Sequence, residues 1–149
     1  MPERYFVRRV WREQFETPTH LVEAAISQIR RHEPHVFAPE IAPAAGWLGD
    51  QLRKALREAG VMRTRMLPVQ PKRTGWNKEG RAQASRKFFD GNQVVFEEPT
   101  EENGVQRLVN ELMAYPAEAN APGSDDCVDA LTCALLRSRG GGMRVGRSR

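Results

Sequence analysis

The sequence is poor in cysteine, in aromatic side chains and in long apolar runs. Of its 149 residues only two are cysteine, and 7% are aromatic. No apolar run is long enough to span a bilayer, which argues against an integral membrane protein. The first ten residues lack the apolar core of a signal peptide. These absences predict a protein of the cytoplasm with no membrane partner.

Metal-binding and nucleotide-binding signatures are also scarce. Cys127 and Cys133 lie six positions apart in one apolar stretch, and no CxxC pair is present. Such cysteines cannot easily pair with each other within a helix, so buried thiols in a reducing compartment are the favoured interpretation. No G-x-x-x-x-G-K-[ST] loop occurs, which excludes a P-loop ATPase motif from this sequence. The three histidines show no ligand spacing.

Basic residues, by contrast, are in excess. The formal net charge is +4 and the sequence pI is about 9.5. This balance suits a polyanion such as nucleic acid, although many proteins that bind no nucleic acid are equally basic. The length fits one domain with a sizeable core, which we place at residues 1–136. Residues 137–149 carry a glycine run and arginines without an acid, and are expected to form a basic disordered tail.

Strand-like and helix-like segments alternate along the chain. Thr17-Pro18 is a favourable helix start, and Gly60 is a favourable helix stop. We predict strands at residues 5–11, 36–38, 61–69 and 93–96, and helices at 17–32, 47–59, 78–90, 105–112 and 124–136. Alternation of this kind predicts an α/β fold, with the Tyr5, Val36 and Val61 strands neighbouring one another in a central sheet flanked by helices.

The most informative segment carries Asp125, Asp126 and Asp129 at the start of the last predicted helix. Spacings of three and four place these side chains on one face, opposite the apolar residues. Two interpretations are open. The helix dipole favours acids in a first turn by about 0.3–1 kcal/mol each. It does not explain three acids on one face, which repel each other and which would suit a divalent cation.

Glu40 is a second candidate. It follows the short apolar segment 36–38, at the end of a predicted strand, where open α/β sheets place their sites. An exposed loop carboxylate is the alternative. A strand-end Glu near helix-borne Asp side chains would supply the oxygen ligands that Mg²⁺ and Mn²⁺ prefer.

Several motifs resemble one family. Residues 124–131, Ser-Asp-Asp-Cys-Val-Asp-Ala-Leu, are similar to the (H/S/N)-D-D-x-x-D-A-L signature near the end of the nuclease domain of tailed-phage large terminase subunits. Other segments match the family in the same order: residues 5–12 its second strand, Glu40 with Gly46 and Leu48 its acidic strand end and next helix, 71–82 its K-x-x-R-A region, 88–96 its F-x-x-G-x-V-x-F hairpin, and 108–116 its F-x-x-E-L-x-x-F-P helix. The similarity covers nearly everything from Tyr5 to Arg137.

This resemblance implies a ribonuclease H-like fold with a central mixed sheet. It implies a metal-dependent endonuclease that cuts concatemeric double-stranded phage DNA during genome packaging in the host cell cytoplasm. The cofactor would be Mg²⁺ or Mn²⁺ in a two-metal site, and the protein partners a small terminase subunit and a portal protein. Glu40 and Asp126 would be the catalytic metal ligands, supported by Asp125 and Asp129. The sequence leaves open whether Asp125 or Asp126 points at the metal.

The chain departs from the family at its start. Such domains begin with a strand carrying an aspartate, followed by a hairpin turn that corresponds here to Met1-Pro2-Glu3-Arg4. We therefore expect the first strand to be missing, the chain to be a fragment, and its nuclease activity alone to be poor. A late gene start, a split gene and a decayed prophage remnant all fit. Two functional alternatives also remain: another ribonuclease H-like nuclease such as a junction resolvase, and an inactive basic DNA-binding remnant.

A basic stretch precedes and enters the third predicted helix. Its members are Lys72, Arg73, Lys78, Arg81, Arg86 and Lys87. They are candidates for contacts with DNA phosphates beside the nuclease site. A solvated loop and helix face explains the same residues equally well.

Overall fold

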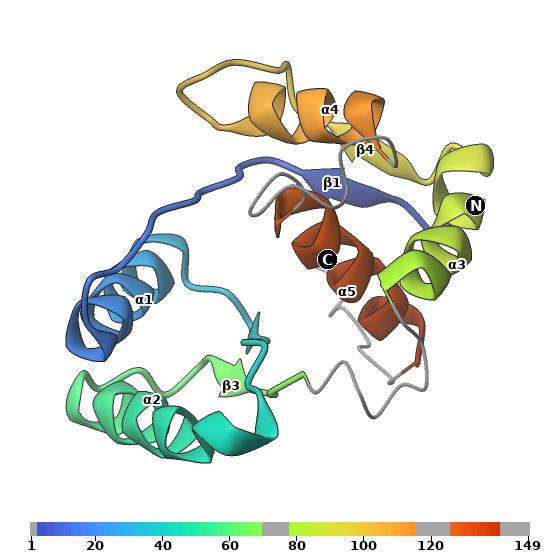
Figure 1. Ribbon diagram of the computed structural model, residues 1–149. Coiled ribbons are helices and arrows are strands. Elements are labelled where there is room, and N and C mark those ends of the chain that lie inside the picture. Colours follow the sequence, from blue (N-terminus) through green and yellow to red (C-terminus); the bar gives the residue numbers. More distant parts are fainter. Residues whose placement is uncertain (1–2, 70–77, 116–125, 141–149) are drawn as a thin grey trace, which may run out of the picture. The chain divides into compact units, whose positions relative to one another are not determined.

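The computed structural model describes residues 3–69, 78–115 and 126–140 (Figure 1). The chain divides into two compact units. Glu13–Gly75 forms the continuous unit, and Met1–Arg12 together with Trp76–Arg149 forms the split unit. Both contain helices and a small parallel ladder, so the predicted α/β character is confirmed. The assignment of residues 1–136 to one domain stays a prediction. None of the helices within the described ranges has the length and apolarity needed to cross a membrane.

The continuous unit is a helical hairpin with a short ladder. Its elements are α1 (Pro18–His32), β2 (Val36–Phe37), the 3-10 turn η1 (Pro43–Ala45), α2 (Gly46–Glu58) and β3 (Arg65–Met66). Strands β2 and β3 pair in parallel, and α1 packs against α2. The most buried apolar side chains are Ile29, Ile41, Leu52 and Leu56.

Local sequence sets the ends of both helices in this unit. The Thr17 hydroxyl accepts the His20 backbone N–H at 3.3 Å, as expected for a capping residue before a proline. At the end of α2, Gly60 adopts φ +67° and its N–H donates to the Arg57 carbonyl. The next N–H, from Val61, donates to the Leu56 carbonyl. This bond pattern is a Schellman motif, and it confirms the predicted stop at Gly60.

The split unit carries the candidate site. Its elements are β1 (Tyr5–Val7), α3 (Lys78–Asp90), β4 (Val94–Phe96), α4 (Val105–Ala114) and α5 (Asp126–Gly140). Strand β1 pairs in parallel with β4, with Tyr5 opposite Val94. Helix α5 packs against both α3 and α4 (Figure 1). The core contains Leu108, Cys127 and Val128, against which Val7, Val10 and Phe96 also pack.

A turn at Asn103-Gly104 joins the start of α4 to the chain that leaves β1. The Asn103 amide oxygen accepts the Val105 N–H at 3.0 Å, and the Asn103 carbonyl accepts the Val10 N–H at 2.8 Å. Gly104 adopts φ +71°, and a Cβ at this position would overlap the Val10 carbonyl oxygen. Only glycine therefore permits this approach, which fixes where Val10, Trp11 and Arg12 lie.

Several boundaries and one pairing differ from the prediction. Strand β1 stops at Val7 rather than Trp11, and of residues 61–69 only Arg65–Met66 form a strand. The described strands form two separate parallel ladders, so β1 pairs with β4, and the expected central mixed sheet joining it to the Val36 and Val61 strands is not seen. Helix α5 continues to Gly140, past the predicted start of a disordered tail at 137. The remaining tail, 141–149, lies outside the described residues.

Candidate functional site

Two of the three predicted acids occupy the first turn of α5. Asp126 is the first residue of the helix, and Asp129 lies three residues further on. The Asp126 side chain is 58% exposed and the Asp129 side chain 25% exposed. Asp125 lies outside the described residues. The predicted acidic edge on the last helix is thus present in its described part.

Each of these carboxylates faces an arginine from another element. Arg12, after β1, donates from Nη2 to Asp126 Oδ2 at 2.9 Å. Arg81 of α3 places Nη2 3.6 Å from Asp129 Oδ1, and its side chain is only 10% exposed. The Arg81 Nε is buried without a hydrogen-bond partner. These arginines offset the repulsion between acids that share a face.

Glu111 of α4 caps α5 from outside the helix. Its Oε2 accepts the Cys127 backbone N–H at 2.9 Å, and its side chain is 9% exposed. Arg107, one turn earlier in α4, places Nε 3.6 Å from Glu111 Oε1. A carboxylate at this position satisfies a first-turn N–H and is favoured by the helix dipole. The contact ties the start of α5 to α4.

The Cys127 thiol is buried at the start of α5, beside Glu111. Burial, then the hydrogen bond and the negative charge of Glu111, raise the pKa of Cys127 from 9.0 to about 11, while Arg107 and Arg12 oppose the shift. The raised pKa disfavours the thiolate at neutral pH, so nothing in this environment activates the thiol. The predicted buried thiol is confirmed for Cys127, and Cys133 is partly buried.

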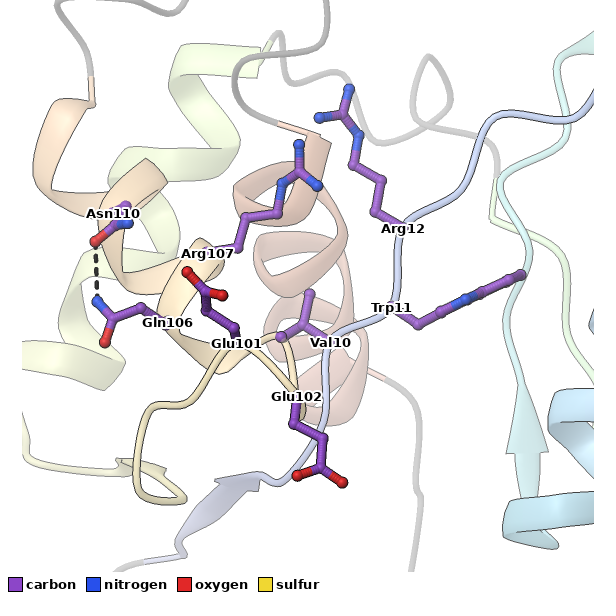
Figure 2. A pocket seen from close by; sticks show the side chains of 9 residues that line it. Val10, Trp11, Arg12, Glu101, Glu102, Gln106, Arg107 and Asn110 are labelled. Atoms are coloured by element: carbon purple, nitrogen blue, oxygen red, sulfur yellow. Dashed lines mark hydrogen bonds between the residues drawn. The ribbon is translucent and has the colours of Figure 1, made fainter.

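Two cavities adjoin Arg12. One, of about 450 Å³, is lined by Trp11, Arg12, Gln106, Arg107 and Asn110, with Glu101 and Glu102 also contributing (Figure 2). The other, of about 330 Å³, is lined by Arg12, Asp126 and Cys127 together with apolar side chains that include Val7, Leu108 and Leu131. Arg12 thus lines both cavities, and it also donates to Asp126 at the start of α5.

Glu40 belongs to the continuous unit. Its side chain is exposed, and its backbone forms an isolated parallel bridge with Val69. The Ile41 N–H donates to the Val69 carbonyl at 3.1 Å, which extends the β2–β3 pairing beyond the strands. The expected position at a strand end is therefore observed. The approach of Glu40 to the aspartates of the split unit stays a prediction.

Only some members of the predicted basic stretch lie on the surface. Lys72 and Arg73 lie outside the described residues, and Lys78 is the first residue of α3. Arg86 and Lys87 are exposed, with Arg86 3.6 Å from Asp90 and the Lys87 ammonium 5.6 Å from the centre of the Phe88 ring. Arg81 was expected on a surface under both interpretations, but it is buried and paired with Asp129. The packing of α3 against α5 encloses the Arg81 side chain, including its Nε, and explains this difference.

Three residues with clear roles at this site were not singled out from the sequence: Arg12, Arg107 and Glu111. Arg12 ends the motif at 5–12, and Glu111 is the acid of the motif at 108–116, so both motifs carried a signal. Their partners are distant in sequence, which is why the pairings could not be read from spacing.

The donor set suits a hard cation only in part. Asp126 and Asp129 supply carboxylate oxygens, the ligand type that Mg²⁺ and Mn²⁺ prefer. Within residues 3–69, 78–115 and 126–140, no three acidic, histidine or cysteine side chains are grouped so as to hold a metal. Ligation by Asp125 falls outside these ranges.

Comparisons with protein-family models, with curated proteins and with solved structures give no match for this chain. The functional interpretation therefore depends on the motifs and on the site geometry.

Proposed function

We propose that this chain is a metal-dependent nuclease domain of the phage large-terminase kind, with a ribonuclease H-like fold, which hydrolyses phosphodiesters of double-stranded DNA. The observation that carries the proposal is the presentation of Asp126 and Asp129 on the first turns of α5, within the motif that resembles the terminase signature. The basic balance of the chain and the exposed cations Arg86 and Lys87 agree with a polyanionic substrate.

In this proposal Asp126, Asp125, Asp129 and Glu40 hold Mg²⁺ or Mn²⁺. Bound ions of this kind activate a water and stabilise the leaving oxygen of the phosphodiester. Glu111 positions Asp126, because it fixes the start of α5 through the Cys127 N–H. Arg81 positions Asp129 from a buried place on α3. Arg12 neutralises Asp126 while no cation is bound there.

A second function is favoured by one observation. Each described aspartate of the site already has an arginine beside it, so the carboxylates need no cation to offset their repulsion. A DNA-binding module without hydrolysis would have this arrangement. A junction resolvase would share the metal chemistry and differ in preferring four-way junctions over linear duplexes.

The test measures Mn²⁺ binding by calorimetry and plasmid cleavage with Mg²⁺ or Mn²⁺. For the unchanged chain we expect weak Mn²⁺ binding and slow cleavage. Asp126→Asn should lower Mn²⁺ affinity by about 10-fold or more, because affinity for a hard cation depends on ligand charge. Asp50→Asn is the matched control, since Asp50 is an exposed helix carboxylate 3.1 Å from Arg53. Equal Mn²⁺ binding by both variants contradicts the proposal. DNA binding without cleavage in every variant supports the binding module.

A further inference from the structure

Arg12 lies between two different environments. On one side its guanidinium donates to Asp126 at 2.9 Å. On the other side it lines the 450 Å³ cavity together with Arg107, Gln106 and Asn110 (Figure 2). The Arg12 side chain is 22% exposed, whereas that of Arg81 is 10% exposed and held between helices. Of these two arginines, Arg12 is the one that can reach an incoming ligand by a change of rotamer.

The cavity has the chemistry of a nucleic-acid contact. It presents two guanidinium groups and the amides of Gln106 and Asn110, which hydrogen bond to each other at 3.0 Å. Guanidinium forks match phosphate oxygens. Glu101 and Glu102 also line the cavity and oppose an anion, so the attraction must come from the arginines.

Arg107 is less free to bind a ligand than its 54% exposure indicates. Its Nε lies 3.6 Å from Glu111, and Glu111 in turn accepts the Cys127 N–H at the start of α5. Moving Arg107 would disturb that cap. Arg12 differs from Arg107 in this respect. Its one described side-chain partner is the carboxylate of Asp126, which is largely exposed, so a movement of Arg12 does not disturb the Glu111 cap.

We propose that Arg12 is a DNA phosphate-binding residue that Asp126 restrains in the free protein. While the pair is intact, a phosphate must compete with the carboxylate for the guanidinium. When the charge of Asp126 is occupied by a cation, or removed, Arg12 turns to the cavity and binds the phosphate. By linkage, DNA at Arg12 and a cation at Asp126 then favour each other's binding. The identity of the ligand as DNA rests on the proposed function.

The experiment is a double-mutant cycle on DNA affinity, measured in EDTA so that no cation takes part. The full chain, Asp126→Asn, Arg12→Gln and the double variant are titrated against a labelled duplex by fluorescence anisotropy. Circular dichroism confirms that each variant is folded. Asp126→Asn should bind the duplex about 10-fold more tightly than the unchanged chain, as one released charged contact predicts. The slope of log affinity against log salt should steepen by about one unit.

The double variant separates this mechanism from a general charge effect. If Arg12 is the released group, Arg12→Gln lowers affinity much more in the Asp126→Asn background than in the unchanged chain, and the cycle shows coupling. Additive effects, or no gain from Asp126→Asn, overturn the proposal. DNA binding by no variant overturns it together with the proposed function. A coupled cycle in a chain that shows no Asp126-dependent Mn²⁺ binding supports the role of Arg12 and contradicts the nuclease alone.

Discussion

The two units use charge in different ways. In the continuous unit the helix ion pairs are local and exposed: Asp50 with Arg53, and Lys54 with Glu58, all on α2. The split unit also has local pairs within helices, Arg86 with Asp90 and Arg107 with Glu111. It differs in having two further pairs that join separate elements, Arg12 to the start of α5 and α3 to α5. Exposed local pairs contribute little to stability, whereas pairs across elements also fix geometry. The comparison indicates that the candidate site is held by tertiary structure in the split unit.

The largest expected effect is at Gly104, which can be compared with Gly60 because both have a similar positive φ, +71° and +67°, in different surroundings. Gly104→Ala should lower the free energy of unfolding by about 3 kcal/mol, because the left-handed conformation is strained and the new Cβ overlaps the Val10 carbonyl. Gly60→Ala should cost only about 1 kcal/mol, since nothing lies within 4 Å of its Cβ. Urea unfolding of both variants measures the difference. Equal losses would show that the Asn103-Gly104 turn is not tightly packed against the chain after β1.

A smaller effect is expected from breaking one ion pair in each unit. Asp129→Ala leaves the buried Arg81 without its partner, and should cost about 2 kcal/mol, less than a fully buried pair because Asp129 is a quarter exposed. Asp50→Ala should cost less than about 0.5 kcal/mol. Thermal unfolding followed by circular dichroism gives both values. If the two losses are alike, Arg81 and Asp129 are not coupled in solution, and the contrast between the units weakens.

The smallest effect is a pH dependence confined to the split unit. The pKa of Cys127 is raised from 9.0 to about 11 by burial and by Glu111. The protonated thiol is favoured in the folded state, so its contribution is fully present below pH 9 and is lost as pH rises towards 11. Unfolding free energies measured across this window should fall less steeply for Cys127→Ser than for the unchanged chain. An identical slope for both would exclude Cys127 as the cause.

Helices were predictable from local sequence, and strand pairing was not. Capping by Thr17 and termination at Gly60 depend on residues within one turn, and the structure confirms both. The local sequence of β1 predicts a strand, but the segment with which it pairs, Val94–Phe96, lies far along the chain and could not be predicted from local sequence. The strand predicted at 61–69 was too long because apolar composition cannot distinguish a paired segment from a half-buried extended one.

The site divides in the same way. The spacing of Asp126 and Asp129 predicted one helix edge, and α5 confirms that part. The arginines beside them come from other elements, Arg12 from the segment after β1 and Arg81 from α3, so no spacing within a motif could reveal them. Arg81 was expected on a surface because charged residues usually lie there. Its burial depends on the packing of α3 against α5, which only tertiary structure shows.

The parallel pairing of β1 with β4 also has a consequence for synthesis. Tyr5–Val7 is synthesised before the continuous unit, and its ladder partner Val94–Phe96 only after it. Until then the edge of β1 that pairs with β4 is uncovered, and Phe6, which is 63% exposed in the folded chain, adds an apolar side chain. Unpaired strand edges of this kind invite association between nascent chains. The β1–β4 ladder of the split unit can therefore form only late in synthesis, after the continuous unit is complete.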